Sequence, residues 1–199
     1  MSGLELKDKV QMIREDIIKM AEEMYKYLQP YCIAIYLGGS YCQDYIKNKG
    51  DVDFICFADK PVDMCHIRRL IYFYYKHHNV PDEYDFIQVR TKQKEEHAYG
   101  SYINKEMIKL VGQDIPFEFD VREKDREEYK KILIETINKL DFGKIRNQKR
   151  WYQVLRGYYI LKNNSYDLSE EEKDILNKVH DQEEGWEQYK ISTNDIEKL

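Results

Sequence analysis

This chain of 199 residues is 42% hydrophobic with 4 Pro and 9 Gly, a composition that excludes a disordered chain and suits one mid-sized domain or two small ones. Its formal net charge of -5 argues against a long nucleic acid as a partner, because binding such a polyanion needs clustered Lys and Arg. It has no apolar run of ~18 residues and opens on a charged amphipathic pattern without a signal peptide, so we expect a cytoplasmic protein with no membrane partner.

The first half of the chain carries both helix and strand patterns. Apolar residues at three- and four-residue intervals predict a helix over 4–28, which Pro30 ends. Runs rich in Ile, Val, Tyr and Phe predict three strands, at 32–37, 52–57 and 84–89. A further helix opens at Pro61, and residues 107–111 are either a strand or the end of a helix. This order of elements predicts an α/β or α+β fold.

The second half of the chain is wholly helical in pattern. Apolar stripes at helical spacing recur from about residue 122 onward. The last long helix begins at Ser169, whose hydroxyl can form a capping box with Glu172. We therefore place a domain boundary near residue 121, with a first domain at 1–121 and a helical C-terminal bundle at 122–199.

The segment Gly38-Gly39-Ser40 directly follows the first predicted strand. Two glycines at a strand end allow a sharp turn and a close approach of the backbone to a phosphate, which a Cβ would obstruct. Their N–H groups and the Ser40 hydroxyl would then face the anion, above all if a helix starts at Ser40. The segment therefore predicts a phosphate-binding turn made of Gly38, Gly39 and Ser40.

Three acidic residues follow on the next two predicted strands. Asp51 and Asp53 lie two residues apart, so their carboxylates project from the same face and can share divalent cations. Asp85 is a charged residue inside an apolar run, a placement that needs a partner such as a metal, and we take it as the third ligand. Glu83 and Glu118 stay open as alternatives for this third acid. Because carboxylates suit Mg²⁺, we expect Asp51, Asp53 and Asp85 to be the metal ligands and the catalytic residues.

Together, these residues predict a reaction. Two Mg²⁺ ions held by the three carboxylates would bind a nucleoside triphosphate and offset the charge that develops on the leaving pyrophosphate. A hydroxyl of the acceptor would attack the α-phosphate in line, and Asp85 would take its proton. The sequence thus predicts an enzyme that transfers a nucleoside monophosphate.

The spacing of these residues resembles the signature of the polymerase-beta-like nucleotidyltransferase superfamily, in which a Gly-Ser is followed about ten residues later by Asp-x-Asp and then by a third acid on a following strand. The likeness covers about residues 33–89. Within that superfamily the chain is similar to bacterial antibiotic nucleotidyltransferases, such as the aminoglycoside adenylyltransferases, and to minimal nucleotidyltransferases of toxin–antitoxin systems. The resemblance implies a short mixed sheet backed by helices, with ATP as the donor of AMP.

The nature of the acceptor follows from the resemblance and from charge. The antibiotic enzymes imply a small molecule with a hydroxyl group, such as an aminoglycoside, and hence a role in antibiotic resistance. The acidic stretch within 170–187 would attract such a cationic acceptor by electrostatic steering. The minimal nucleotidyltransferases imply instead an antitoxin-type enzyme that transfers AMP to a partner protein, and this stays the alternative.

Overall fold

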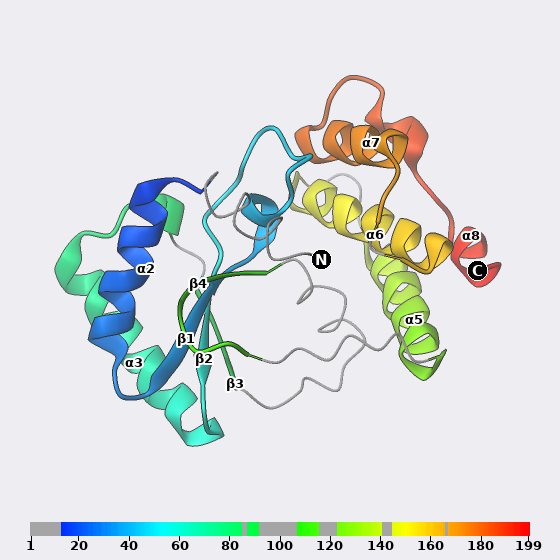
Figure 1. Ribbon diagram of the computed structural model, residues 1–199. Coiled ribbons are helices and arrows are strands. Elements are labelled where there is room, and N and C mark those ends of the chain that lie inside the picture. The colour runs from blue at the N-terminus through cyan, green and yellow to red at the C-terminus, as the bar shows by residue number, and fades with distance from the viewer. Residues whose placement is uncertain (1–12, 85–86, 92–106, 116–122, 141–144, 166) are drawn as a thin grey trace. The chain divides into compact units, whose positions relative to one another are not determined.

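The structure, a computed structural model, describes residues 13–84, 87–91, 107–115, 123–140, 145–165 and 167–199 (Figure 1). The described residues form two compact units, and each unit has its own hydrophobic core. The first unit consists of described residues within 13–43, 49–91 and 107–115, and the second consists of those within 44–48 and 123–199. Residues 44–48 therefore belong with the C-terminal helices, which the order of the chain alone does not indicate.

The first unit is built on a mixed sheet with the strand order β3-β2-β1-β4 among the described residues. The central strand β1 (Cys32–Leu37) pairs antiparallel with both β2 (Phe54–Ala58) and β4 (Ile108–Gly112). The edge strand β3 (Ile87–Thr91) pairs parallel with β2. The sheet and its helices confirm the predicted α+β fold, and the segment predicted at 107–111 as a strand or a helix end is the strand β4, which begins and ends one residue later.

The third strand begins later than its residue pattern predicts. Tyr84 ends a short 3-10 helix, η2 (Asp82–Tyr84), in which its N–H donates to the carbonyl of Pro81 at 3.0 Å. Because that N–H is bonded within a turn, it cannot pair with a neighbouring strand. The prediction that the strand starts at Tyr84 is therefore wrong. Asp85, the predicted third metal ligand, lies outside the described residues.

Two helices cover one face of the sheet (Figure 1). Helix α2 (Glu15–Leu28) packs on β1 and β4, while α3 (Pro61–His78) packs on β2 and β3. The expected helix over 4–28 is thus described from Glu15 onward, and its apolar stripe is buried as predicted, with its fully covered side chains at Ile17, Ala21, Met24 and Leu28. Alternate strand residues meet this stripe because side chains of a strand point to its two faces in turn.

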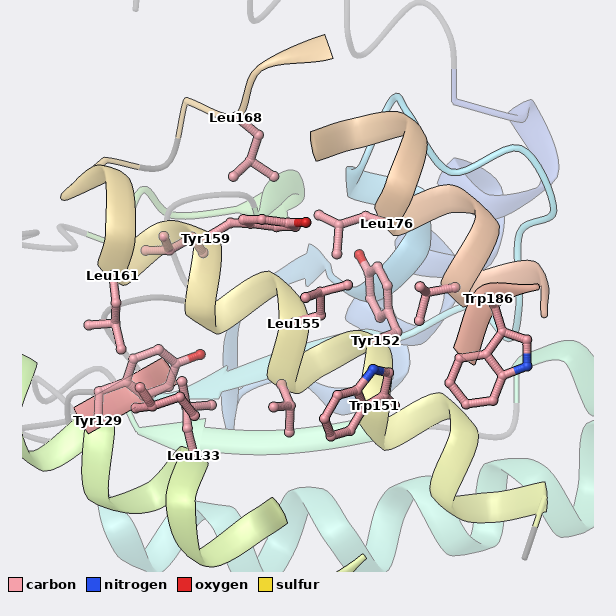
Figure 2. Close-up of a cluster of buried hydrophobic side chains, with 14 of the residues drawn as sticks. Tyr129, Leu133, Trp151, Tyr152, Leu155, Tyr159, Leu161, Leu168, Leu176 and Trp186 are labelled. Atoms are coloured by element: carbon pink, nitrogen blue, oxygen red, sulfur yellow. The ribbon is translucent and has the colours of Figure 1, made fainter. Parts of the chain in front are cut away.

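The second unit is a set of helices around one aromatic core. It contains α5 (Glu123–Lys139), α6 (Ile145–Asn163), α7 (Glu170–Asp181), η3 (Trp186–Tyr189) and α8 (Thr193–Glu197). Trp151 of α6 is completely buried, and side chains of α5, α7 and η3 gather along the same helix (Figure 2). The predicted capping box at the start of α7 is confirmed, since Ser169 and Glu172 exchange hydrogen bonds.

Residues 44–48 are held to this helical unit by the buried side chain of Ile46 and by polar contacts. Ile46 is 1% exposed and belongs to the same core as Trp151. The Lys47 N–H donates to Asn177 Oδ1 at 2.8 Å, and Asn48 Nδ2 donates to Asp181 Oδ2 at 2.6 Å. The long loop between β1 and β2 is therefore anchored at its middle rather than free.

Among the described helices, none has both the length and the apolar character that crossing a bilayer requires.

Candidate active site

The antiparallel pairing of β1 with β2 brings the glycine turn to the aspartates. Leu37 at the end of β1 lies opposite Phe54 at the start of β2, so the next residues of the two strands, Gly38 and Asp53, are neighbours. The Gly38 N–H donates to the Asp53 carbonyl oxygen at 2.8 Å. Two motifs that are ten or more residues apart in the sequence thus meet at one edge of the sheet.

Gly39 makes room for the side chain of Asp53. Its φ is +61°, a left-handed conformation that residues with a Cβ adopt at a cost. A Cβ placed on Gly39 would lie only 1.7 Å from Asp53 Oδ2. The sequence predicts that this glycine leaves space for a phosphate; in the structure, the group that occupies the space is the Asp53 carboxylate itself.

Ser40 lies in the short 3-10 helix η1 (Gly39–Cys42), and its hydroxyl braces the returning loop. Ser40 Oγ accepts a hydrogen bond from the Gly50 N–H at 3.0 Å. Lys49 Nζ donates to the carbonyl oxygens of Ser40 and Gln43 at 3.1 and 2.6 Å. Because the Ser40 oxygen is the acceptor in its bond to Gly50, the hydroxyl proton remains able to point toward an anion.

Asp51 and Asp53 flank a buried residue. Val52 is 0% exposed, whereas Asp51 is exposed and Asp53 is partly buried. Both aspartates precede β2 instead of lying within it, so the predicted strand start at Val52 is two residues early. The prediction that both carboxylates project from one face of a strand therefore stays a prediction, since the burial pattern shows only that both side chains are more exposed than Val52.

Of the three candidates for the third acid, the structure describes only Glu83. Asp85 and Glu118 lie outside the described residues. Glu83 is described, and its carboxylate receives two hydrogen bonds from the Arg14 guanidinium, at 3.0 and 3.2 Å. Of the three candidates, Glu83 is thus committed to an ion pair. Across the part of the chain that the structure describes, no group of three or more His, Cys, Asp or Glu gathers.

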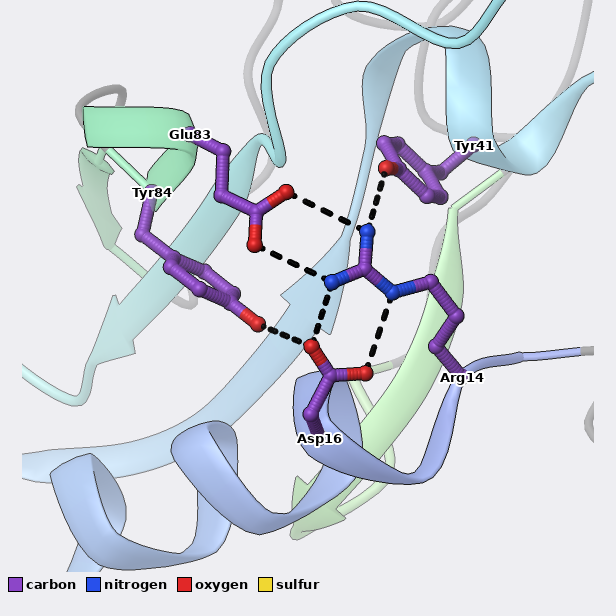
Figure 3. Close-up of polar contacts among 5 residues, drawn as sticks. All are labelled: Arg14, Asp16, Tyr41, Glu83 and Tyr84. Atoms are coloured by element: carbon purple, nitrogen blue, oxygen red, sulfur yellow. Dashed lines mark hydrogen bonds and ion pairs between the residues drawn. The ribbon is translucent and has the colours of Figure 1, made fainter. Parts of the chain in front are cut away.

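A polar cluster that sequence reasoning missed lies beside this site (Figure 3). Arg14 donates to Asp16 at 3.0 and 2.5 Å, to Glu83, and to the Tyr41 hydroxyl at 3.2 Å. The hydrogen bond from Arg14, followed by one from Tyr84, lowers the pKa of Asp16 to about 2. Burial raises the pKa of Tyr84, and the negative charge of Asp16 raises it further. No spacing rule links these residues, because three separate segments of the chain supply them.

No protein-family model matches the chain, and no curated protein or solved structure is similar to it. The candidate site therefore depends on its own geometry. That geometry gives an exposed Asp51 and a partly buried Asp53 before and after a buried valine, a glycine turn in direct contact with Asp53, and a serine hydroxyl in a short helix. Such a site offers hard oxygen ligands for a cation next to the Ser40 hydroxyl, which can donate to an anion. The Gly38 N–H, which the sequence predicts to face the anion, is instead bonded to the Asp53 carbonyl oxygen.

Proposed function

We propose that this protein is a Mg²⁺-dependent nucleotidyltransferase that moves AMP from ATP to a hydroxyl group of a small-molecule acceptor. The observation that carries the proposal is the direct contact between the glycine turn and Asp53, made through the Gly38 N–H and the space above Gly39. A metal-bound triphosphate needs carboxylates and phosphate-binding groups at one place, and the β1–β2 pairing, which brings the glycine turn to Asp53, supports this proposal.

The residues at this edge fit Mg²⁺ by their chemistry. Asp51 and Asp53 offer carboxylate oxygens, which are the ligands that hard cations prefer, and Asp51 is exposed enough to be reached. Asp85 would complete the set, as the sequence predicts. When bound, the metal would stabilise the negative charge that develops on the leaving pyrophosphate.

The chain's own groups would then orient the triphosphate and activate the acceptor. The Ser40 hydroxyl can donate its proton to a phosphate oxygen while its oxygen keeps the bond to Gly50. Asp85 would accept the proton of the attacking hydroxyl, which requires the acceptor to lie opposite the leaving group. Glu83 is a poor alternative for this base because its carboxylate is paired with Arg14.

The acidic stretch gives limited support to a cationic acceptor. Glu170 of α7 pairs with Lys173 at 2.7 Å, and Asp174 pairs with Lys178 at 2.6 Å. Glu172 is held in the capping box. Much of the negative charge on this helix is therefore balanced by neighbouring residues. The proposal consequently defines the acceptor by its hydroxyl group and not by a positive charge.

A partner protein is the second candidate acceptor, and an observation on the first unit favours it. Helix α3 exposes two large aromatic side chains, Tyr72 at 65% and Phe73 at 47%, together with Val62 at 60%. Tyr72 and Phe73 contact each other, with 5.7 Å between ring centroids, and neighbouring exposed aromatic groups are typical of protein contact surfaces. Transfer of AMP to a protein would use the same carboxylates and the same glycine turn.

The test is transfer of label from α-labelled nucleoside triphosphates, with Mg²⁺, to a panel of aminoglycosides and, separately, to proteins of a cell extract. We expect Asp53→Asn to abolish nearly all transfer while circular dichroism stays unchanged, because the substitution keeps the shape of the side chain and removes a metal-binding charge. Asp59→Asn is the matched control, since Asp59 is an exposed carboxylate just beyond β2. Transfer that survives Asp53→Asn at the level of the control would overturn the proposal.

A further inference from the structure

Arg14 joins three segments of the first unit through one side chain (Figure 3). Its Nη1 donates to the Tyr41 hydroxyl at 3.2 Å and to Glu83 Oε2 at 3.2 Å, and its Nη2 donates to Glu83 Oε1 at 3.0 Å. Its Nε donates to Asp16 Oδ1 at 3.0 Å. The planar guanidinium thus binds both oxygens of one carboxylate and reaches a tyrosine more than 20 residues away in the sequence.

Two of these partners belong to segments that build the candidate site. Tyr41 lies in η1, directly after Ser40. Glu83 lies in η2, and its carbonyl oxygen accepts the N–H of Val52, the residue between the two aspartates, at 2.6 Å. Arg14 therefore bonds to a residue of each turn: Tyr41, the neighbour of Ser40, and Glu83, whose carbonyl oxygen holds Val52.

The rest of the cluster fixes Arg14 in place. Asp16 Oδ2 accepts the Tyr84 hydroxyl at 2.8 Å, and the Tyr84 ring is buried in parallel stacking against Phe54, with 5.7 Å between ring centroids. Phe54 is the first residue of β2 and follows Asp53 directly. A lysine would replace the guanidinium only in part, because a single ammonium group lacks the flat fork that serves two carboxylates and a hydroxyl together.

We propose that Arg14 is a positioning residue of the active site, which holds the Tyr41 and Glu83 turns so that Ser40 and the pair Asp51–Asp53 stay in their bonded arrangement. The effect of Arg14 on catalysis rests on the proposed function, whereas its effect on the order of the two turns does not. Arg14 itself contacts no reacting group in this assignment. Its removal would leave Asp16 and Glu83 near each other without the cation between them, so both turns would lose their common anchor.

Hydrogen exchange on the full chain tests the structural part without any assay of activity. In Arg14→Ala we expect several-fold faster exchange of the amides in 40–43 and 50–53, which include the bonded N–H groups of Gly50 and Val52. Exchange in the middle of β1 should stay as in the wild type. Lys19→Ala is the matched control, because Lys19 is an exposed cation of the helix that Arg14 precedes, and its ion pair with Glu23 spans 4.0 Å.

The kinetic part uses the labelled-triphosphate assay described above. We expect Arg14→Ala to lower kcat at least several-fold, Arg14→Lys to restore only part of it, and Lys19→Ala to leave it unchanged. Unchanged exchange at 40–43 and 50–53 in Arg14→Ala, or equally faster exchange throughout β1, would overturn the positioning role. If the wild type transfers no nucleotide, the proposed function fails, whereas the exchange result still decides whether Arg14 orders these two turns.

Discussion

Replacing Gly39 with alanine tests the geometry of the site most directly. Its φ of +61° and the 1.7 Å that would separate a Cβ from Asp53 Oδ2 are two separate penalties. The left-handed backbone costs a residue with a Cβ about 1–2 kcal/mol, and the forced displacement of a packed neighbour costs about 1–3 kcal/mol. We therefore expect Gly39→Ala to lower the free energy of unfolding by about 2–5 kcal/mol, a large part of the stability of a typical domain.

The double-mutant cycle with Asp53→Ala separates the two penalties. Once the carboxylate is gone, the added methyl group no longer meets Oδ2, so Gly39→Ala should then cost only the backbone term of about 1–2 kcal/mol. Urea unfolding followed by circular dichroism measures all four proteins. Gly50→Ala is the control, because a Cβ at Gly50 has Ser40 Oγ as its nearest neighbour, at an ordinary 3.8 Å. An equal cost of Gly39→Ala with and without Asp53 would refute the contact on which the proposed site depends.

Three further predictions concern the metal, acid stability and the C-terminal unit. Titration calorimetry should show triphosphate binding with Mg²⁺ or Mn²⁺ and much weaker binding in excess chelator, because uncompensated carboxylates repel phosphates; equal affinity in both would contradict the metal site. Because Arg14 and then Tyr84 lower the pKa of Asp16 from 3.8 to about 2, the stabilisation from this group should be full above pH ~4 and should be lost as the pH falls through about 2. The side chain is 51% exposed, so this loss should stay below about 1 kcal/mol, and Asp16→Asn should remove it from the acid unfolding curve. Ser169→Ala should destabilise the helical unit by about 1 kcal/mol in urea unfolding, whereas Ser165→Ala, outside the capping box, should cost less.

Local patterns in the sequence determined the elements and the residue types of the site. The 3.6-residue period of α2 and the capping box at Ser169 depend on neighbours within one or two turns, so a reading of the chain alone finds them. The association of Gly38–Ser40 with Asp51 and Asp53 was also predicted, because glycine and carboxylate chemistry limits what such a pair of motifs can do. The three predicted strands are present: β1 has the predicted bounds, whereas β2 and β3 begin two and three residues later than predicted.

Tertiary structure decided which residues that are distant in the sequence form hydrogen bonds or contacts with one another. Tyr84 is of a residue type that favours strands. Its N–H, however, donates to the Pro81 carbonyl and its hydroxyl to Asp16, and the pattern of apolar residues does not reveal these hydrogen bonds. Gly39 is needed for the carboxylate of Asp53, a fact that depends on the register of β1 against β2. No motif or spacing in the sequence distinguishes Arg14, and only the folding of three segments onto its guanidinium gives it a place beside the site. Long-range pairing is specified by packing and register over the whole unit, and no local window of sequence contains that information.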